Sequence, residues 1–224
     1  MISVIDYGMG NLRSVAKALE AAGAGDVLVT SDIKTIDKAD KIVLPGVGAM
    51  QDAMKELKRL DLIKVIKESI LKKPFLGICL GLQLLFTESE EGHKTRGLGV
   101  FKGKVKRFSS DMKAPHMGWN QIVRRTKDVP STWFDYAHHK SLRAGGRETK
   151  KNINLLKNIP DAAYFYFCHS YYVVPDDKGL IATTTEYGID FVSSICKGNL
   201  FACQFHPEKS QSVGLKLLEN FVRL

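Results

Sequence analysis

The chain of 224 residues has no long hydrophobic run and no recognisable leader. No apolar stretch approaches the roughly 20 residues that a membrane-spanning helix needs. The first residues, Met1 to Asp6, lack the basic start and the cleavage site of a signal peptide, and their apolar character favours a strand. We therefore expect a cytoplasmic protein that has no membrane partner.

Cysteine is scarce, and its spacing excludes two classes of protein. The four cysteines lie apart among apolar neighbours, without a CxxC pair. In a chain of this length such spacing argues against both a disulfide scaffold and a zinc site, so we expect no metal. Cys168, Cys196 and Cys203 are predicted to be small core residues. Cys79 differs from them because of its neighbours.

A dinucleotide-binding fingerprint is also missing. Gly8 and Gly10 follow the first predicted strand, but Arg13 and Ser14 stand where the third glycine belongs, and no acidic residue ends a second strand at the expected distance. The chain has neither an internal repeat nor a low-complexity tract. We expect no cofactor.

The formal charge of +9 is concentrated in one segment. Residues 121–160 hold nine Lys/Arg against three acidic residues, which gives +6 of that total. Two interpretations stay open: a solvated basic insertion, or a contact surface for a phosphate-bearing ligand or an acidic partner. Because the charge is so localised, we do not expect a nucleic-acid partner.

The first half of the chain alternates strand and helix patterns, which is typical of a parallel sheet with helices on both faces. Asp61 is placed to cap the second half of a broken helical stretch. The strands are predicted at Ile2–Tyr7, Asp26–Thr30, Lys41–Leu44 and Pro74–Ile78, and the helices at Asn11–Ala22, Ala49–Lys73 with a break near Leu60-Asp61, and Leu80–Phe86.

The second half is mostly strand and ends in a helix at about Ser210–Val222. We therefore predict a single α/β domain of the flavodoxin-like kind, with a central, mixed and mostly parallel sheet flanked by helices and an antiparallel portion in the second half. The strands expected there are Val100–Phe108, Ala114–Val123, Ala163–Val174, Leu180–Tyr187, Phe191–Lys197 and Leu200–Phe205.

A cysteine stands between two glycines where a predicted strand meets a predicted helix, in Gly77-Ile78-Cys79-Leu80-Gly81. This is a thiol version of the G-x-S-x-G turn. On so sharp a turn, side chains two residues to either side would collide unless they are glycine. The helix start favours the thiolate by ~0.3–1 kcal/mol, which is less than one pKa unit, so a second partner is needed.

His206 is the candidate for that second partner. It ends a predicted strand, and Pro207 is expected to keep the chain extended, so that Glu208 points the same way as His206 and orients its imidazole. Of the six histidines, none of the others has an acidic residue two positions away in an extended run. The adjacent His138 and His139 lack further metal ligands nearby.

Taken together, these motifs resemble a known family. Gly77-Ile78-Cys79-Leu80-Gly81-Leu82-Gln83 and His206-Pro207-Glu208 look like the signature pair of the class I (triad) glutamine amidotransferases. Five motifs narrow the resemblance to the glutaminase subunits of imidazole glycerol phosphate synthases: Asp6-Tyr7-Gly8-Met9-Gly10-Asn11, Leu44-Pro45-Gly46-Val47-Gly48-Ala49, His116-Met117-Gly118-Trp119-Asn120, His169-Ser170-Tyr171-Tyr172 and Gln204–Ser210.

The resemblance implies a role for each matching residue. Cys79 would attack the carboxamide of L-glutamine, and His206, oriented by Glu208, would protonate the departing ammonia and then activate water. The ammonia would pass to a (β/α)8 barrel cyclase subunit, with which the chain forms a heterodimer in histidine biosynthesis. The family's other functional positions correspond to Val47, Gly48 and Leu80 in the oxyanion hole, to Gly46, Gln83, Glu91, Ser170 and Tyr171 in glutamine binding, and to Asn11, Trp119, Tyr166 and Lys209 at the cyclase interface.

The resemblance covers residues 1–224 as one glutamine amidotransferase type 1 domain, apart from an unusual basic insertion at about 126–160. Within it, Thr132–Asn154 matches no family motif. Three alternatives stay open: a glutaminase serving another ammonia-dependent, sugar-amidating synthase, an unrelated thiol hydrolase on the same fold, and a non-catalytic assembly subunit.

Overall fold

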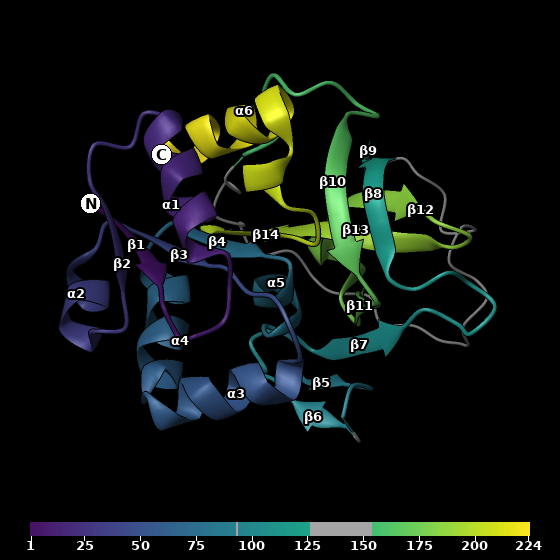
Figure 1. Ribbon diagram of the computed structural model, residues 1–224, viewed down its shortest axis with the longest axis horizontal. Helices are drawn as coiled ribbons and strands as arrows, with labels where there is room; N and C mark the ends of the chain where they lie inside the picture. The colour runs from purple at the N-terminus through teal and green to yellow at the C-terminus, as the bar shows by residue number, and fades with distance from the viewer. Residues whose placement is uncertain (93, 126–153) are drawn as a thin grey trace, which may run out of the picture.

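The computed structural model describes residues 1–92, 94–125 and 154–224 (Figure 1). They form the predicted α/β fold, with a central mixed sheet and helices on both of its faces. The predicted insertion at 126–160 lies outside the described residues except for 154–160, so it stays a prediction. No helix in the described ranges is long and apolar enough to cross a membrane.

The parallel half of the sheet contains, in spatial order, β2 (Val27–Thr30), β1 (Ile2–Ile5), β3 (Lys41–Leu44), β4 (Phe75–Ile78) and β14 (Leu200–Cys203). Side chains of β1 enter the core on both faces: Val4 belongs to one hydrophobic cluster and Ile5 to the other. Parallel strands that are buried on both faces are nearly continuous apolar runs, which is why the sequence predicted them.

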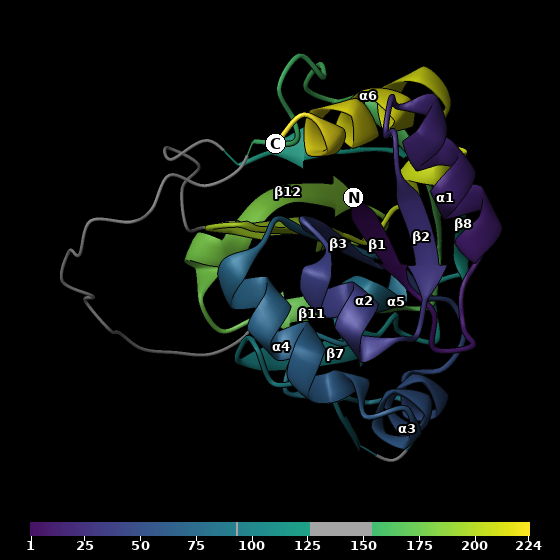
Figure 2. The same cartoon turned by 90° about the vertical axis from the view of Figure 1, so that its left-hand side faces the viewer.

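Two groups of helices cover the two faces of this sheet, as Figure 2 shows. Leu19 and Leu217 pack in the cluster on one face, and Ile66 packs in the cluster on the other. The helices are α1 (Leu12–Ala21) and α6 (Gln211–Val222) on the first face, and α2 (Ile33–Lys38), which was not predicted, α3 (Met50–Arg59) and α4 (Leu62–Lys72) on the second.

The helical stretch 49–73 is broken where predicted, but its second half begins differently. Asp61 precedes α4 with a left-handed backbone (φ 55°), and its side chain makes no capping hydrogen bond, so the predicted cap was wrong. The helix predicted at 80–86 is also shorter: α5 spans Leu80–Gln83. Beyond it, the N–H groups of Leu85 and Phe86 donate to carbonyls only three residues back, which tightens the chain out of the helix.

The strand predicted at 163–174 is in fact two strands in different sheets. β10 (Tyr164–His169) pairs with β8 (His116–Gln121) in a separate antiparallel sheet, whereas β11 (Tyr171–Pro175) joins the large sheet. Inward-facing apolar residues continue through both, so the pattern gave no sign of the change at Ser170. The remaining elements are β5 (Glu88–Ser89), β6 (Thr95–Arg96), β7 (Gly103–Arg107), β9 (Val123–Arg124), β12 (Ile181–Glu186), β13 (Asp190–Lys197) and the short 3-10 helix η2 (Lys178–Leu180).

Candidate active site

Cys79 lies at the corner where β4 runs into α5. Its backbone angles, φ 53° and ψ −108°, are rare for a residue other than glycine. A Cβ atom on Gly81 would lie 1.9 Å from the carbonyl oxygen of Leu44. A Cβ atom on Gly77 would lie 2.9 Å from the Cβ of Ala202. Close contacts therefore require both glycines, as the sequence indicated.

His206 and Glu208 form a hydrogen-bonded pair after β14. His206 Nδ1 lies 2.8 Å from Glu208 Oε1, and the two side chains are only 4% and 2% exposed. The predicted extended chain was wrong: Pro207–Lys209 is a 3-10 helix, η3. Proline suits its first position because the fixed φ matches that of a helix. A tight turn, rather than strand alternation, brings the carboxylate beside the imidazole.

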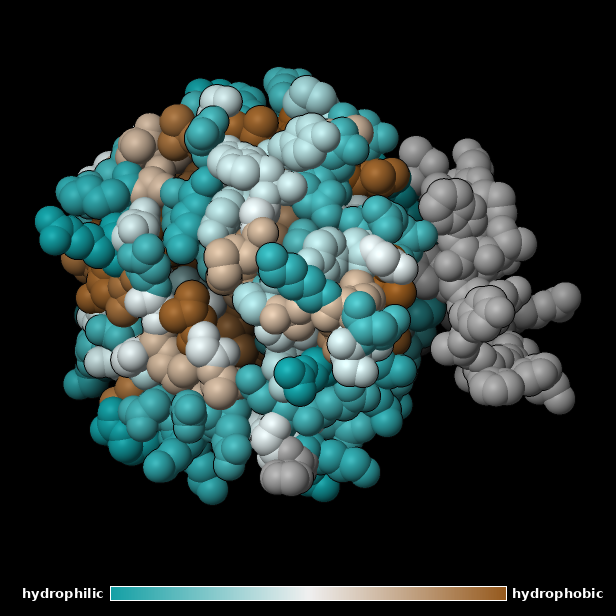
Figure 3. Space-filling model, turned by 45° about the vertical axis from the view of Figure 1, so that its right-hand side comes forward, coloured by the Kyte–Doolittle hydropathy of each residue, from teal (hydrophilic) through white to brown (hydrophobic). Residues whose placement is uncertain are grey.

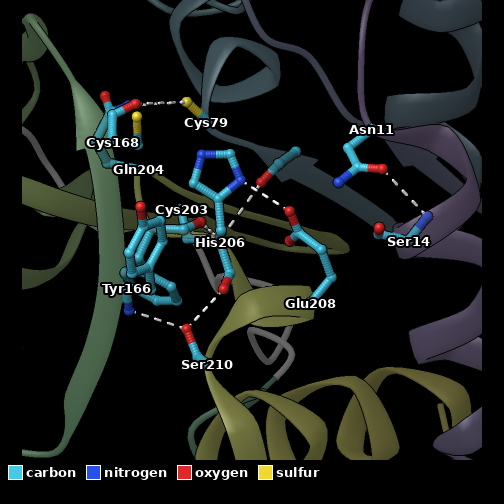
Figure 4. A network of polar contacts seen from close by, with 12 residues as sticks. Asn11, Ser14, Cys79, Tyr166, Cys168, Cys203, Gln204, His206, Glu208 and Ser210 are labelled. Atoms are coloured by element: carbon cyan, nitrogen blue, oxygen red, sulfur yellow. Dashed lines mark hydrogen bonds and ion pairs between the residues drawn. The ribbon is translucent and has the colours of Figure 1, made fainter. Parts of the chain in front are cut away.

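The imidazole of His206 lies between the sulfur of Cys79 and the carboxylate of Glu208 (Figure 4). Because Nδ1 of His206 is hydrogen-bonded to Glu208, the other ring nitrogen, Nε2, is the one that faces the sulfur. Burial alone would lower the pKa of His206, but the Cys79 thiolate and Glu208 raise it to about 10. Burial and the charge of Cys79 raise the pKa of Tyr7 above its ordinary value. The raised pKa of His206 favours the imidazolium form of its ring between the sulfur and Glu208.

A cleft of about 260 Å³ opens at the Cys79 corner. Cys79 and His206 both line it, so sulfur and imidazole face one cavity. Cys168 also lines it and is half-buried, because strand alternation turns it toward the cleft; its prediction as a core residue was wrong. Cys203 is fully buried as predicted, and Cys196 is partly buried against the core. The cleft is also lined by Val47, Gly48, Leu80, Gln83, Glu91, Pro115, His169, Ser170, Tyr171 and Lys209.

Several residues that the resemblance assigns to the oxyanion hole or to glutamine binding already have partners. The Leu80 N–H donates to the carbonyl oxygen of Gly46 at 3.3 Å, so it is not free for an oxyanion in this conformation. Gln83 Nε2 donates to the carbonyl oxygen of Tyr171 at 3.1 Å. Glu91 Oε2 accepts a hydrogen bond of 2.6 Å from the first N–H of α3. Of the predicted glutamine-binding residues, Gly46 alone does not line the cleft.

The geometry agrees with a comparison against protein families. The family model described as glutamine amidotransferase class-I matches residues 3–224. The chain belongs to the class-I glutamine amidotransferase family. It is thus an enzyme of that kind, and the fold expected from the resemblance is confirmed.

Relatives of known name match nearly the whole chain. The imidazole glycerol phosphate synthase subunit HisH of Aquifex aeolicus (strain VF5) is 51% identical over 221 residues, which are 98% of this chain and 95% of that protein. The subunit named HisH 1 of Methanococcus maripaludis is 46% identical over 228 residues, with both chains fully covered. A solved structure of PurLQS from Thermotoga maritima, only 17% identical, shares the fold with a TM-score of 0.68 over 99% of this chain and 97% of its own.

Three of the predicted interface residues of this amidotransferase lie together beside His206. The rings of Trp119 and Tyr166 meet edge to face at 6.2 Å, and Lys209 Nζ lies 5.7 Å from the centre of the Tyr166 ring. Trp119 is 46% exposed, and apolar groups lie among hydrophilic ones on the side that carries β8 and β10 (Figure 3). Asn11 lies apart from them and caps α1, with its Oδ1 3.4 Å from the Ser14 nitrogen.

Sequence reasoning missed a buried histidine pair next to the cleft. His116 Nδ1 lies 3.1 Å from His169 Nε2, and His169 Nδ1 lies 2.8 Å from the carbonyl oxygen of Tyr171. Burial lowers the pKa of His116 to about 4 and that of His169 to about 3, so both rings are neutral. Because a carbonyl can only accept, His169 donates to it and in turn accepts from His116. The two rings therefore connect β8 to the cleft wall.

Proposed function

We propose that this chain is the glutaminase subunit of an imidazole glycerol phosphate synthase, in which Cys79, His206 and Glu208 hydrolyse L-glutamine. The observation that carries the catalytic part is the position of the His206 imidazole, held on one side by Glu208 at 2.8 Å and facing Cys79 on the other (Figure 4). Close relatives named for that synthase support the assignment to it. Residues 1–224 would act as one domain.

The first half of the reaction forms a thioester. The Cys79 thiolate attacks the side-chain carbonyl carbon of glutamine, and the electron pair of the carbonyl moves to its oxygen. When the intermediate collapses, the carbon–nitrogen bond breaks and the nitrogen takes the proton from His206 Nε2, so that ammonia leaves. Glu208 stabilises the imidazolium until that proton is given up.

The second half hydrolyses the thioester. The neutral His206 now removes a proton from water, whose oxygen attacks the same carbon. The carbon–sulfur bond breaks, glutamate leaves, and Cys79 returns to the thiolate beside a protonated His206. Since the raised pKa of His206 favours this charged pair, the cycle ends in the state that begins the next turnover.

The described conformation is not set up for fast turnover. Backbone N–H groups must point at the oxygen that becomes negative, and the Leu80 N–H instead donates to the Gly46 carbonyl. Gly48 in the same loop has φ +89°, a conformation open to glycine but costly for other residues. We infer that the loop 45–48 must turn the Gly46 carbonyl away before the oxyanion hole of Val47, Gly48 and Leu80 can form.

The ammonia needs an acceptor, and the synthase provides one in a (β/α)8 cyclase subunit. Trp119, Tyr166 and Lys209 are grouped beside His206, so a partner that covers them would also cover the point where ammonia is released. Trp and Tyr are enriched among the residues that contribute most to the binding energy of protein interfaces. We propose that these residues, together with Asn11, contact the cyclase.

Glutamate release from glutamine tests the activity. With a cyclase subunit and its ligand present, wild-type protein should release glutamate continuously and the Cys79→Ala variant should release none. Release that survives in Cys79→Ala would refute the triad. Activation by a sugar-amidating synthase and not by the cyclase would keep the glutaminase but reject the partner.

A further inference from the structure

The side chain of Gln204 touches the reacting sulfur but has no role in the mechanism above. Gln204 is fully buried, between β14 and His206. Its Nε2 lies 3.5 Å from Cys79 Sγ, and its Oε1 lies 3.0 Å from Gln83 Nε2. A buried amide this close to a nucleophile has to present either a donor or an acceptor to it.

The surrounding hydrogen bonds settle which one it presents. The carbonyl oxygen of Tyr171 can only accept, so Gln83 must turn its Nε2 toward it, at 3.1 Å. That same Nε2 also donates to the oxygen of Gln204, so Gln204 must direct its oxygen at Gln83 and its NH₂ group at the sulfur. The orientation of the Gln204 amide is therefore fixed by the Tyr171 carbonyl through Gln83. It does not depend on which of the two similar amide atoms of Gln204 is assigned as nitrogen.

We propose that Gln204 is a further catalytic residue, whose amide donates a hydrogen bond to Cys79 and stabilises its thiolate. The proposal rests on the glutaminase function and deepens it. The thiolate exists at two points of the cycle, before attack and when the thioester is hydrolysed, and the same donor serves at both. Gln83 and the Tyr171 carbonyl act through Gln204 and are positioning groups.

An amide suits this place because it does not titrate. Hydrogen bonds to charged groups are stronger than those between neutral groups, so the donor favours thiolate over thiol. It does so without adding a charge that would compete with the triad. The ionisable groups already around the sulfur come from several elements: Tyr7 after β1, Cys168 and His169 in β10, Tyr171 in β11, Cys203 in β14, His206 and Glu208 beyond it, and Glu91 and Lys209 at the cleft.

The pH profile of alkylation at Cys79 tests the proposal without using glutamine. Iodoacetamide reacts with the thiolate, and mass spectrometry of the Cys79 peptide follows the rate. In Gln204→Leu the midpoint should rise by about one pH unit, which is about tenfold less thiolate below it. The control Phe205→Leu leaves a packing defect at the next buried residue and should keep the wild-type midpoint. An unchanged midpoint in Gln204→Leu overturns the proposal.

A second measurement avoids any substitution at Gln204. In ¹⁵N-labelled wild-type protein, the side-chain amide signal of Gln204 should shift as Cys79 ionises, and the shift should vanish in Cys79→Ala. If the amide signal of Gln204 does not shift as Cys79 ionises, the proposal is overturned, even if Gln204→Leu does not fold. Failure of the glutaminase function would look different, because wild-type protein would then release no glutamate with its partner present.

Discussion

At the scale of single residues, the chemistry depends on charges that stabilise one another. Cys79 has the left-handed φ of 53°, a strained conformation that the protein tolerates because it aims the sulfur into the cleft. The Glu208 carboxylate has one oxygen bonded to His206, and its other oxygen, Oε2, is buried without a hydrogen-bond partner among the residues that the structure describes. Such an arrangement costs stability, and this cost supports the proposed catalytic role of Glu208.

Substitution of Glu208 tests its effect on the pKa of His206, on catalysis and on stability. In Glu208→Gln the pKa of His206 should fall, because a charge that raises it is gone, and kcat should fall less than the ~10²–10⁴-fold expected for His206→Asn. The free energy of unfolding should fall, because removing one partner of this buried pair leaves the His206 imidazolium without its counter-charge. NMR titration of the imidazole, glutaminase kinetics and urea unfolding measure the three quantities. An unchanged kcat would take Glu208 out of the triad.

At the scale of elements, the site depends on how strands and helices meet. The corner between β4 and α5 packs against the end of β3, where the Leu44 carbonyl oxygen leaves no room for a side chain at Gly81. The neutral histidine pair joins β8 and β10 across their antiparallel register, in which His116 lies opposite His169. The corner and the histidine pair each lead to a prediction about the stability of the fold.

The Gly81→Ala substitution should disrupt the corner. Its methyl group would overlap the Leu44 carbonyl oxygen, 1.9 Å away, so β3 or the corner has to shift. We expect unfolding to become easier by about 2 kcal/mol or more and glutaminase activity to be lost. Gly25→Ala is the matched control, because a Cβ there meets no atom within 4 Å and φ is not left-handed. Equal unfolding free energies for the two variants would contradict the packing account.

Acid should weaken the junction of β8 and β10. The folded pKa values of His116 and His169, about 4 and about 3, lie below the unfolded value near 6.5. As pH falls from 6.5 toward 4, the unfolded chain takes up protons that the folded protein refuses, so stability decreases by up to about 1.4 kcal/mol per pH unit for each ring. Above pH 6.5 both rings are neutral in the folded and the unfolded chain, so the two histidines no longer make stability depend on pH. Urea unfolding at several pH values in this range gives the free energy of unfolding as a function of pH. That free energy should fall less steeply with decreasing pH in His116→Gln than in the wild type, and parallel curves would contradict the prediction.

The sequence predicted the parallel half of the fold well because buried parallel strands and amphipathic helices have strong local patterns. The turn at Cys79 was also predictable, because it leaves no room for side chains two residues to either side, and the sequence has Gly77 and Gly81 there. The break at Ser170 and the 3-10 turn after His206 were missed, because which sheet a strand joins depends on distant partners. The Gln204 contact was missed for the same reason: Cys79 lies far away in the sequence.

At the scale of the whole molecule, the glutaminase site and the proposed partner surface adjoin each other. His206 belongs to the proposed triad, and the ring of Tyr166 lies 6.5 Å from its imidazole and meets the ring of exposed Trp119 on its other side. A partner on that surface can therefore act on the cleft. We propose that the partner frees the Leu80 N–H, which donates to the Gly46 carbonyl here and which the proposed oxyanion hole needs. We expect the isolated subunit to be a poor glutaminase.

Binding of the cyclase should raise kcat, and Trp119→Ala should reduce that rise by weakening the complex. Truncation of a central interface aromatic typically costs about 2 kcal/mol of binding, or roughly thirtyfold in Kd. Leu71→Ala, an exposed apolar residue on α4, is the control and should bind normally. Titration calorimetry and glutaminase kinetics with and without the cyclase measure both effects. Equal kcat in the two conditions would contradict the coupling.

The covalent intermediate gives the most direct test of the central claim that the thiol at this corner is the nucleophile. Wild-type protein with its partner is mixed with glutamine, quenched in acid during turnover, and digested for mass spectrometry. We expect a γ-glutamyl thioester on the peptide that contains Cys79 and on no other cysteine. Glutamate released at a normal rate, with the adduct absent from Cys79 or carried by another residue, would contradict the account.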